Sequence, residues 1–307
     1  RKDLIRVWGS VISKITSEMI KVPKQIPVLI KYSIGSHFKV LNKTPDLEDL
    51  KVIKKYSEYE IVNWYPINEI PKGDKTKEPR NLNLNYVYQI FTKRNLLCLS
   101  FVFKKIMEID SSEKSSLLAW FTSSHSRLHK FNTYLRQHNR HVGPLPGTLY
   151  ISSTQAEISP MYFLKQKLKD FNKINHTSQQ IILSTQSNTN LTNIPSSSID
   201  YIFTDPPFGE NLMYSELNFM LESWLKVFTN NKKEAIMNKT QKKGLVEYQE
   251  LMEQCFKENY RIVKPNRWMT IVFHNSQNKV WMAIQEAIQR AGFVVADVRI
   301  LDKKKGT

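Results

Sequence analysis

The segment Tyr201–Leu225, YIFTDPPFGENLMYSELNFMLESWL, places a short apolar run directly before Asp-Pro-Pro. The run of Tyr201, Ile202 and Phe203 predicts a buried strand that stops abruptly. Neither proline can donate a backbone hydrogen bond, so the chain cannot continue in a sheet. In open α/β sheets, ligands bind at the carboxyl ends of strands. The segment therefore predicts a carboxylate, that of Asp205, with two exposed carbonyls and an aromatic ring at such an end.

The residues after this strand predict a turn at Gly209 and then a helix. Apolar residues recur there with helical spacing, which indicates a face that packs in the core rather than a cofactor contact. These residues are Leu217, Met220, Leu221, Trp224 and Leu225.

The four residues Asp205, Pro206, Pro207 and Phe208 resemble the Asp-Pro-Pro-aromatic catalytic motif of the amino-group DNA methyltransferases. An exocyclic amine is a poor nucleophile because its lone pair is delocalised into the ring. The resemblance implies that the Asp205 carboxylate and a backbone carbonyl accept the two N–H groups of that amine. It also implies that Phe208 stacks on the base and that S-adenosylmethionine donates the methyl group. Without the resemblance, the same residues predict a strand end followed by a proline turn.

A second segment, Phe-Thr-Lys-Arg-Asn-Leu from residue 91, is similar to one in large bacterial adenine-specific DNA methylases, some linked to phage defence. There, too, it lies upstream of the Asp-Pro-Pro motif. Thr92 predicts the start of a helix, and Lys93 and Arg94 fall in its first turn. Cations are unfavourable at that end unless they face an anion, so we expect contacts with DNA. A solvated basic pair is the alternative. The predicted inner face contains Leu96, Leu97, Phe101 and Ile106.

The composition favours a globular protein with a polyanionic partner. The 307 residues are 41% hydrophobic and carry a net charge of +17, which suits one large or two ordinary domains that bind DNA. Cys98 and Cys255 are far apart in sequence, so we predict two buried free thiols in a reducing cytoplasm. The sequence shows no secretory signal and no apolar run that could span a membrane.

Basic and aromatic residues interleave from Arg127 to His141, as a nucleic-acid surface requires: cations for phosphates and rings for unstacked bases. We expect Arg127, Arg136 and Arg140 to contact DNA, together with Tyr214 beside the motif. Four of the seven histidines also lie near this stretch. A zinc site is the less favoured interpretation, because no cysteine accompanies them. The four are His125, His129, His138 and His141.

The approach to the motif predicts a neighbouring buried strand at Ile181–Leu183. In the methyltransferase family such a strand end contacts the adenine of the donor, often through an acidic residue. Gln186 and Ser187 occupy that place here, so the resemblance implies that they bind the cofactor together with Asp205. A polar turn before Leu191 is the alternative.

Periodicity and breakers predict the remaining elements. The expected helices cover residues 4–20, 46–59 with Leu50 and Ile53 inward, 161–174, 248–263 and 280–290, the last closed by Gly292. The expected strands cover residues 26–32 and 37–41, which turn at Gly35, and residues 148–152, 268–273 and 293–300. Residues 66–80 predict a polar loop, and residues 229–243 a mobile loop that either meets DNA or is simply solvated.

The order of elements over about residues 181–302 resembles the catalytic half of the methyltransferase fold. We therefore predict an α/β chain with an incomplete Rossmann-like sheet in residues 151–307. Before it come an α+β N-terminal region, 1–80, and a helical, basic and aromatic connecting region, 81–150. One feature departs from the family: the chain has nine glycines but no Gly-x-Gly, so the Phe-x-Gly-x-Gly loop that binds the donor is missing. Either that loop lies outside the sequence or donor binding is degenerate.

Both chain ends look cut, which predicts part of a longer protein. The first expectation for function is an adenine N6 DNA methyltransferase of a restriction or phage-defence system, acting with other subunits; cytosine N4 remains open. The second is a non-catalytic DNA-binding subunit that keeps the fold. The third is a methyltransferase acting on RNA or on a protein glutamine.

Overall fold

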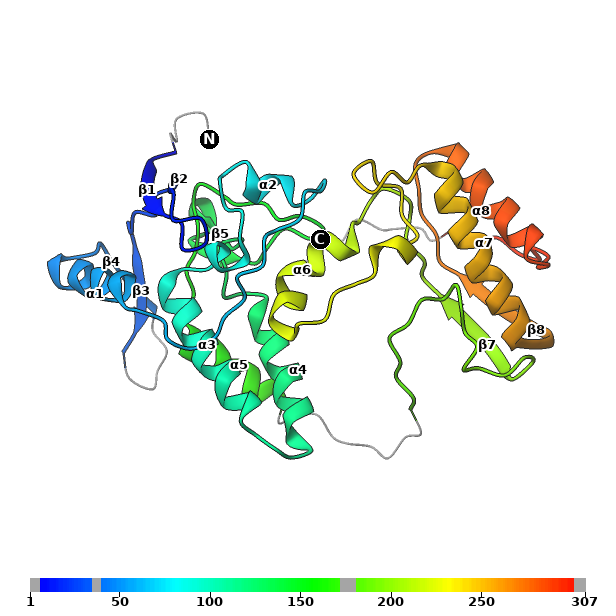
Figure 1. The fold of residues 1–307 in the computed structure, drawn as a ribbon, viewed down its shortest axis with the longest axis horizontal. Coiled ribbons are helices and arrows are strands. Elements are labelled where there is room, and N and C mark those ends of the chain that lie inside the picture. The colour runs from blue at the N-terminus through cyan, green and yellow to red at the C-terminus, as the bar shows by residue number, and fades with distance from the viewer. Residues whose placement is uncertain (1–5, 35–39, 172–180, 301–307) are drawn as a thin grey trace. The chain divides into compact units, whose positions relative to one another are not determined.

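The structure is a computed structural model that describes residues 6–34, 40–171 and 181–300. Within these residues it is a mixed α/β chain with eight α-helices and four two-stranded sheets (Figure 1). The chain divides into two compact units. The first unit contains residues 1–177 and 218–228, and the second contains 178–217 and 229–307. The boundaries that the sequence suggested, after residues 80 and 150, both fall inside the first unit.

The first unit begins with two hairpins. β1 (Trp8–Ile12) pairs antiparallel with β2 (Met19–Pro23), so the helix predicted over residues 4–20 is wrong for the residues described. The Ser13 hydroxyl accepts hydrogen bonds from the backbone N–H groups of Ile15 and Thr16, which turns the chain locally instead of continuing a helix. β3 (Ile30–Ser33) pairs with β4 (Val40–Lys43), which confirms the predicted strand pair. The turn predicted at Gly35 lies outside the described residues.

The predicted charged helix is confirmed as α1 (Leu47–Glu58), which starts with a capping box between Asp46 and Asp49. Its inner face is not as predicted, because Leu50 and Ile53 are 42% and 43% exposed. The loop predicted after Pro66 contains the short helix α2 (Lys77–Arg80) and is followed by the 3-10 turn η1 (Val87–Ile90).

The core of the first unit is helical. α3 (Lys93–Met107), α4 (Glu113–His125) and α5 (Pro160–Phe171) pack together, and Thr92 caps α3 as predicted. Leu99 and Phe103 are buried on α3, whereas the predicted core residue Phe101 faces solvent. The helix expected after the motif is α6 (Tyr214–Leu225), whose residues from Asn218 onward belong to this unit.

Trp224 on α6 is the centre of an aromatic cluster. Its side chain is fully buried, and four rings lie with their centroids 5.4–6.0 Å from its own. Aromatic pairs at such edge-on distances contribute about 0.5–1.5 kcal/mol each beyond the burial of apolar area. The cluster confirms that the apolar stripe of this helix serves packing. The four rings belong to Trp64, Phe91, Phe103 and Phe121.

A small hairpin follows α4. β5 (Thr133–Leu135) and β6 (Arg140–Val142) pair antiparallel across the 3-10 turn η2 (Arg136–His138). The strand predicted at residues 148–152 is absent. The chain there runs as a loop, and only Gln155 forms a bridge to β5.

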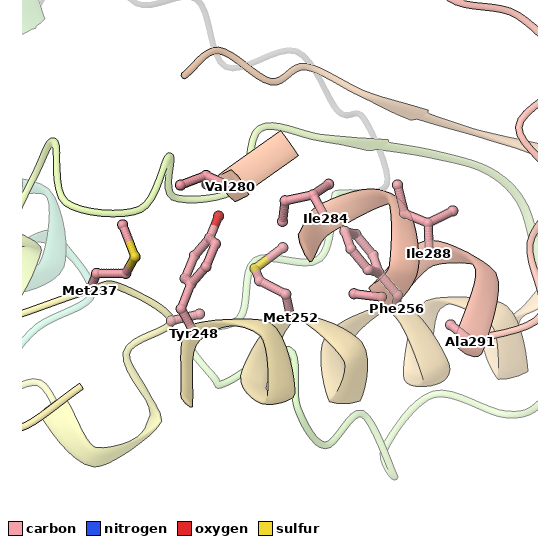
Figure 2. Packing of buried hydrophobic residues seen from close by; sticks show 10 residues of the cluster. Met237, Tyr248, Met252, Phe256, Val280, Ile284, Ile288 and Ala291 are labelled. Carbon is pink, nitrogen blue, oxygen red and sulfur yellow. The ribbon is translucent and has the colours of Figure 1, made fainter. Parts of the chain in front are cut away.

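The second unit contains a parallel pair of strands with two helices. β7 (Ile199–Thr204) runs parallel to β8 (Val263–Ile271), and α7 (Leu245–Ile262) packs against α8 (Asn278–Arg290). These four elements confirm the expected strand, the amphipathic helix, the later strand and the helix that ends before Gly292. Their core includes Tyr248, Met252, Phe256, Ile284 and Ile288 (Figure 2). Full burial of side chains of this size contributes about 1.5–3 kcal/mol each.

Three strand predictions in this unit need correction. Residues 181–183 and 293–300 form no strand, and Ile182 is 95% exposed. β7 forms as predicted but is not buried, because Tyr201 and Phe203 are 54% and 65% exposed. In the described residues this sheet has two strands, and only its other face, through Met269 and Ile271, packs on the helical core.

A buried histidine pair supports the base of the β5–β6 hairpin. The rings of His125 and His129 lie 5.7 Å apart, next to Phe91 and Phe131. Burial lowers the pKa of His125 to about 3 and that of His129 to about 4. Each is therefore neutral in the native state and takes up a proton on unfolding below its ordinary pKa of about 6.5.

We predict that the first unit loses stability as pH falls from about 6.5 to about 4. The unfolded chain binds more protons in this window, so the free energy of unfolding falls by about 1.4 kcal/mol per pH unit for each histidine. Urea unfolding followed by tryptophan fluorescence measures this. His125→Phe should make the dependence shallower, whereas exposed His138→Gln serves as the control. A stability that does not change across the window would contradict the buried neutral pair.

Candidate functional site

The segment Asp205–Phe208 leaves the sheet at the carboxyl end of β7. The carbonyl of Thr204 still accepts a hydrogen bond from the N–H of Val272, and the two prolines then end the ladder. Asp205 is exposed, Pro206 is buried, and Phe208 is half-buried. The structure therefore places the motif where the sequence predicted it, at the end of a strand in a parallel pair.

The three residues after Pro206 are fixed through their carbonyl oxygens. The Tyr248 hydroxyl donates to the carbonyl of Pro207 at 2.6 Å. The Asn275 side-chain amide donates to that of Phe208 at 2.8 Å, and the Met237 N–H to that of Gly209 at 3.2 Å. The donors come from α7, the loop after β8, and the 229–243 segment. Three separate parts of the second unit thus determine the conformation of the motif.

Both side-chain donors are themselves held in place. Burial raises the pKa of Tyr248, so its hydroxyl stays protonated and can donate at neutral pH. The side-chain oxygen of Asn275 accepts from the N–H of Gln277 at 2.8 Å, and the backbone carbonyl of Asn275 accepts from the indole N–H of Trp281 at 2.8 Å. Neither role could be predicted from the sequence, in which Tyr248 is the first residue of the helix expected over 248–263 and Asn275 follows the strand expected over 268–273.

Two acceptors of the motif stay free. In the part of the chain that the structure describes, no hydrogen bond reaches the Asp205 carboxylate or the Pro206 carbonyl. They belong to successive residues, on an exposed and a buried position respectively. The loop can therefore offer a carboxylate oxygen and a carbonyl oxygen to a donor with two N–H groups.

Phe208 has a packing role as well as an accessible face. Its ring meets Phe273 edge-on at 5.4 Å, and Phe273 meets Trp281 edge-on at 4.9 Å. This row of rings joins the motif to the residues after β8 and to α8. Phe208 is only half-buried, so part of its side chain remains accessible.

Tyr214 lies near the motif, as the sequence predicted. Partial burial raises the pKa of its hydroxyl, and the negative charges of Asp205 and Glu234 raise it further. The next residue, Ser215, donates through its N–H and its hydroxyl to the Glu234 carboxylate at 2.9 and 2.6 Å. A carboxylate at this end of α6 also complements the helix dipole.

The prediction of a mobile or solvated loop at residues 229–243 is wrong for its centre, since Glu234 to Asn238 are buried. Asn238 exchanges backbone hydrogen bonds with Lys243 and donates to Glu216 of α6 at 2.9 Å. The segment supports both the start of α6 and, through Met237, the motif.

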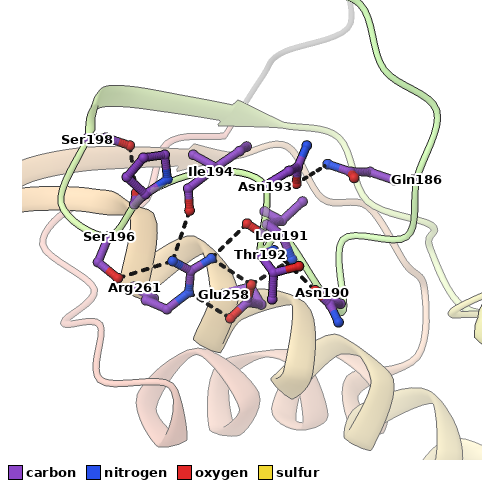
Figure 3. Close-up of polar contacts among 11 residues, drawn as sticks. Gln186, Asn190, Leu191, Thr192, Asn193, Ile194, Ser196, Ser198, Glu258 and Arg261 are labelled. Atoms are coloured by element: carbon purple, nitrogen blue, oxygen red, sulfur yellow. Dashed lines mark hydrogen bonds and ion pairs between the residues drawn. The ribbon is translucent and has the colours of Figure 1, made fainter.

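Gln186 and Ser187 lie in a polar turn, the alternative that the sequence left open. Gln186 donates to Asn193 at 3.1 Å (Figure 3). The hydroxyls of Ser187 and Thr189 lie 2.9 Å apart. Because residues 181–183 form no strand, neither side chain follows a strand end. The structure does not bring them into contact with the motif.

The turn is attached to α7 through Arg261. Its guanidinium donates to the carbonyls of Leu191 and Ile194 and to Glu258 (Figure 3). Glu258 in turn accepts from the Leu191 N–H at 2.6 Å. The Arg261 side chain and this N–H hold the pKa of Glu258 below its ordinary value. This network is structural, because each group is satisfied within the chain.

Lys93 and Arg94 lie in the first turn of α3, as predicted, in the first unit. The anion that Arg94 faces is part of the chain: its guanidinium lies 2.8 Å from Glu157, which also accepts from the Thr92 hydroxyl at 2.8 Å. Partial burial lowers the pKa of Lys93, and the charge of Lys14 adds to this. Arg127, Arg136 and Arg140 also belong to the first unit and border or form the β5–β6 hairpin.

Cys98 and Cys255 are free and half-buried rather than fully buried. Burial raises the pKa of both thiols, that of Cys255 to about 11, so neither is an activated nucleophile. The residues that the structure describes contain no cluster of three or more metal-ligating side chains. Across the same residues, every helix is too short or too polar to cross a membrane.

We predict that Gly209→Ala destabilises the second unit by about 1–3 kcal/mol, because φ is +82° at this position and a side chain there is strained. A Cβ would also lie 3.1 Å from Met237 Cε and 3.3 Å from the Asn275 amide nitrogen. Gly9→Ala is the control, since its Cβ would make only an ordinary 3.6 Å contact. Urea unfolding compares the two variants. Equal stability of both would mean that the turn is not constrained as described.

Comparison with protein-family models, with curated proteins and with solved structures finds no match to this chain. What the motif can do chemically therefore follows from its own groups: two acceptors with no partner among the described residues, and a partly accessible aromatic side chain two residues further on.

Proposed function

We propose that the second unit carries the catalytic residues of a methyltransferase that modifies the exocyclic amine of a nucleic-acid base, with adenine N6 of DNA as the preferred target. One observation carries the proposal. The carbonyls of residues 207–209 are all engaged, while the Asp205 carboxylate and the Pro206 carbonyl have no hydrogen-bond partner within the described part of the chain. An exocyclic amine has two N–H groups and needs two such acceptors. Cytosine N4 presents the same two groups and is the related alternative.

The architecture of the second unit supports this assignment. A parallel strand pair with helices on one face, and a polar loop at its carboxyl end, is one half of the arrangement in which doubly wound sheets bind ligands. We include the Rossmann-like methyltransferase fold in the proposal on this basis.

The residues present do not supply a complete site for S-adenosylmethionine. Gln186 and Ser187 form their hydrogen bonds within their own turn, and the sequence contains no Gly-x-Gly. We propose this cofactor as the methyl donor because an amine nucleophile requires an electrophilic methyl group. A non-catalytic DNA-binding subunit is the second candidate, and the missing glycine loop is the observation that favours it. An RNA or protein-glutamine substrate fits the same two acceptors; the net charge of +17 suits RNA as well as DNA, but suits a protein less.

The chain's own residues would act on the substrate in a definite order. A base inside a duplex cannot reach Asp205, so it must first rotate out of the stack at a cost of a few kcal/mol. Stacking on Phe208 contributes about 1–3 kcal/mol toward holding it. Asp205 and the Pro206 carbonyl would then accept hydrogen bonds from the two N–H groups, which localises the nitrogen lone pair and makes the nitrogen a better nucleophile. A cytoplasmic restriction or phage-defence role, with other subunits, belongs to the same proposal.

Asp205→Ala should reduce methyl transfer by about 100-fold or more, because one pre-organised acceptor is lost from the transition state. Its stability should not change, since the side chain is exposed and makes no hydrogen bond. Asp200→Ala is the matched control, an exposed aspartate on β7 paired with Lys264. Transfer of a labelled methyl group to DNA by the full-length protein measures both. Parental turnover in Asp205→Ala would remove this residue from the reaction.

Substitutions of Phe208 distinguish stacking on a base from packing within the protein. Phe208→Tyr keeps the ring and should retain most activity, whereas Phe208→Ala should lose capture of the target base. Because the ring is only half-buried, we expect Phe208→Ala to lower stability by about 1–3 kcal/mol, less than a fully buried aromatic loses. The readouts are the melting temperature and the fluorescence of 2-aminopurine at the target position. Normal base capture by Phe208→Ala would assign the ring to packing alone.

A further inference from the structure

The β5–β6 hairpin presents an exposed basic tip on a buried base. At the base, Asn132 and Thr133 are buried, and the backbone of Tyr134 donates to the carbonyl of Thr154 at 2.8 Å. At the tip, Asn139 has a φ of +46° and closes the turn by donating to the carbonyl of Arg136 at 3.2 Å. The exposed residues of the tip are Arg136, Gln137, His138, Asn139, Arg140 and His141.

Two further cations border this hairpin. The Lys31 ammonium on β3 donates to the carbonyl of Asn139 and lies 5.4 Å from the ring of Tyr134. The Arg127 guanidinium lies flat against Gly143, where a Cβ would come within 2.7 Å of its central carbon. The pKa of His141 is lowered by partial burial and then by the positive charges of Arg127 and Lys31. We refer to these four cations, Lys31, Arg127, Arg136 and Arg140, as the basic hairpin patch.

No carboxylate balances the patch. The sequence contains no Asp or Glu between Glu113 and Glu157. Among the described residues, none of the four cations forms an ion pair, whereas many other exposed lysines of the chain do. A concentrated, uncompensated positive surface attracts a polyanion and is costly to leave without one.

The aromatic residues of the stretch are engaged within the first unit. Phe131 is buried, and the half-buried Tyr134 donates through its hydroxyl to Asn139 at 2.5 Å and has the Lys31 ammonium over its ring. The expectation that rings in this stretch stack on unstacked bases is therefore wrong for Phe131. What the patch offers is positive charge, which recognises phosphates rather than base identity.

We propose that the basic hairpin patch contacts the phosphate backbone of duplex DNA without reading its sequence. Duplex DNA carries about one negative charge per 1.7 Å of its axis. A hairpin with an arginine on each side of its tip can contact neighbouring phosphates along this row of charges. This assignment rests on the proposed function only in taking the polyanion to be a nucleic acid. The first unit would bind the duplex, separately from the chemistry at Asp205.

Arg136→Gln combined with Arg140→Gln tests the proposal. Each lost phosphate contact should make the dependence of log affinity on log salt shallower by about 0.9, so the pair should change the slope by about 1.8. Fluorescence anisotropy of a labelled duplex, titrated between about 50 and 200 mM salt, measures this. Two duplexes of unrelated sequence should be affected equally.

Lys104→Gln combined with Lys105→Gln is the matched control. It removes the same charge from exposed positions on α3 of the same unit, where both lysines pair with Glu108. We expect a slope close to that of the parent. The assay contains no methyl donor and measures binding alone, so failure of the methyl-transfer proposal would not affect this result.

Three outcomes would overturn the inference. A parental slope in the arginine variant would mean that the patch faces no phosphate. Equal changes in the arginine and lysine variants would assign the effect to net charge alone. A larger change on a single strand of the same sequence than on the duplex would assign the patch to single-stranded nucleic acid.

Discussion

The conformation of the motif in the second unit depends on the three hydrogen bonds that hold the carbonyls of Pro207, Phe208 and Gly209. Each is worth only about 0.5–1.5 kcal/mol net, but together they remove the alternative conformations of a loop that has no sheet to guide it. Their donors reach the loop because α7 and α8 pack through a continuous apolar core. The loop that follows Asp205 is thus held by the buried side chains of Tyr248 and Asn275.

Buried polar groups also stabilise the start of α6. Glu234 and Glu216 are both buried carboxylates, and each accepts hydrogen bonds from its surroundings. A buried charge is tolerated only when it is paired or hydrogen-bonded. The 229–243 segment is therefore a structural part of the site: it connects the start of α6, where Tyr214 lies, to the turn at Gly209.

Under the proposed function, the two units contribute different groups. Among the described residues, the second unit has acceptors without a hydrogen-bond partner at Asp205 and Pro206, and the first has cations without an ion-pair partner on the β5–β6 hairpin. Arg94 shows why charge alone is a poor guide. It was expected to face DNA, yet its partner is Glu157 of the same unit. Arg136 and Arg140 have no such partner among the described residues, so the polyanion assignment rests on them.

The sequence by itself determined the elements whose causes are local. Thr92 predicted a helix start because its side-chain oxygen can accept from the first turn, and Pro206 and Pro207 predicted the end of β7 because they cannot donate. It also predicted that Asp205 and Phe208 lie at that end. Only the tertiary structure decided which apolar segments find a partner: Trp8–Ile12 pairs as a strand, whereas residues 181–183 do not. It alone identified Tyr248, Asn275 and Lys31, because their contacts join residues 41 to 108 positions apart, and such contacts leave no periodic trace in sequence.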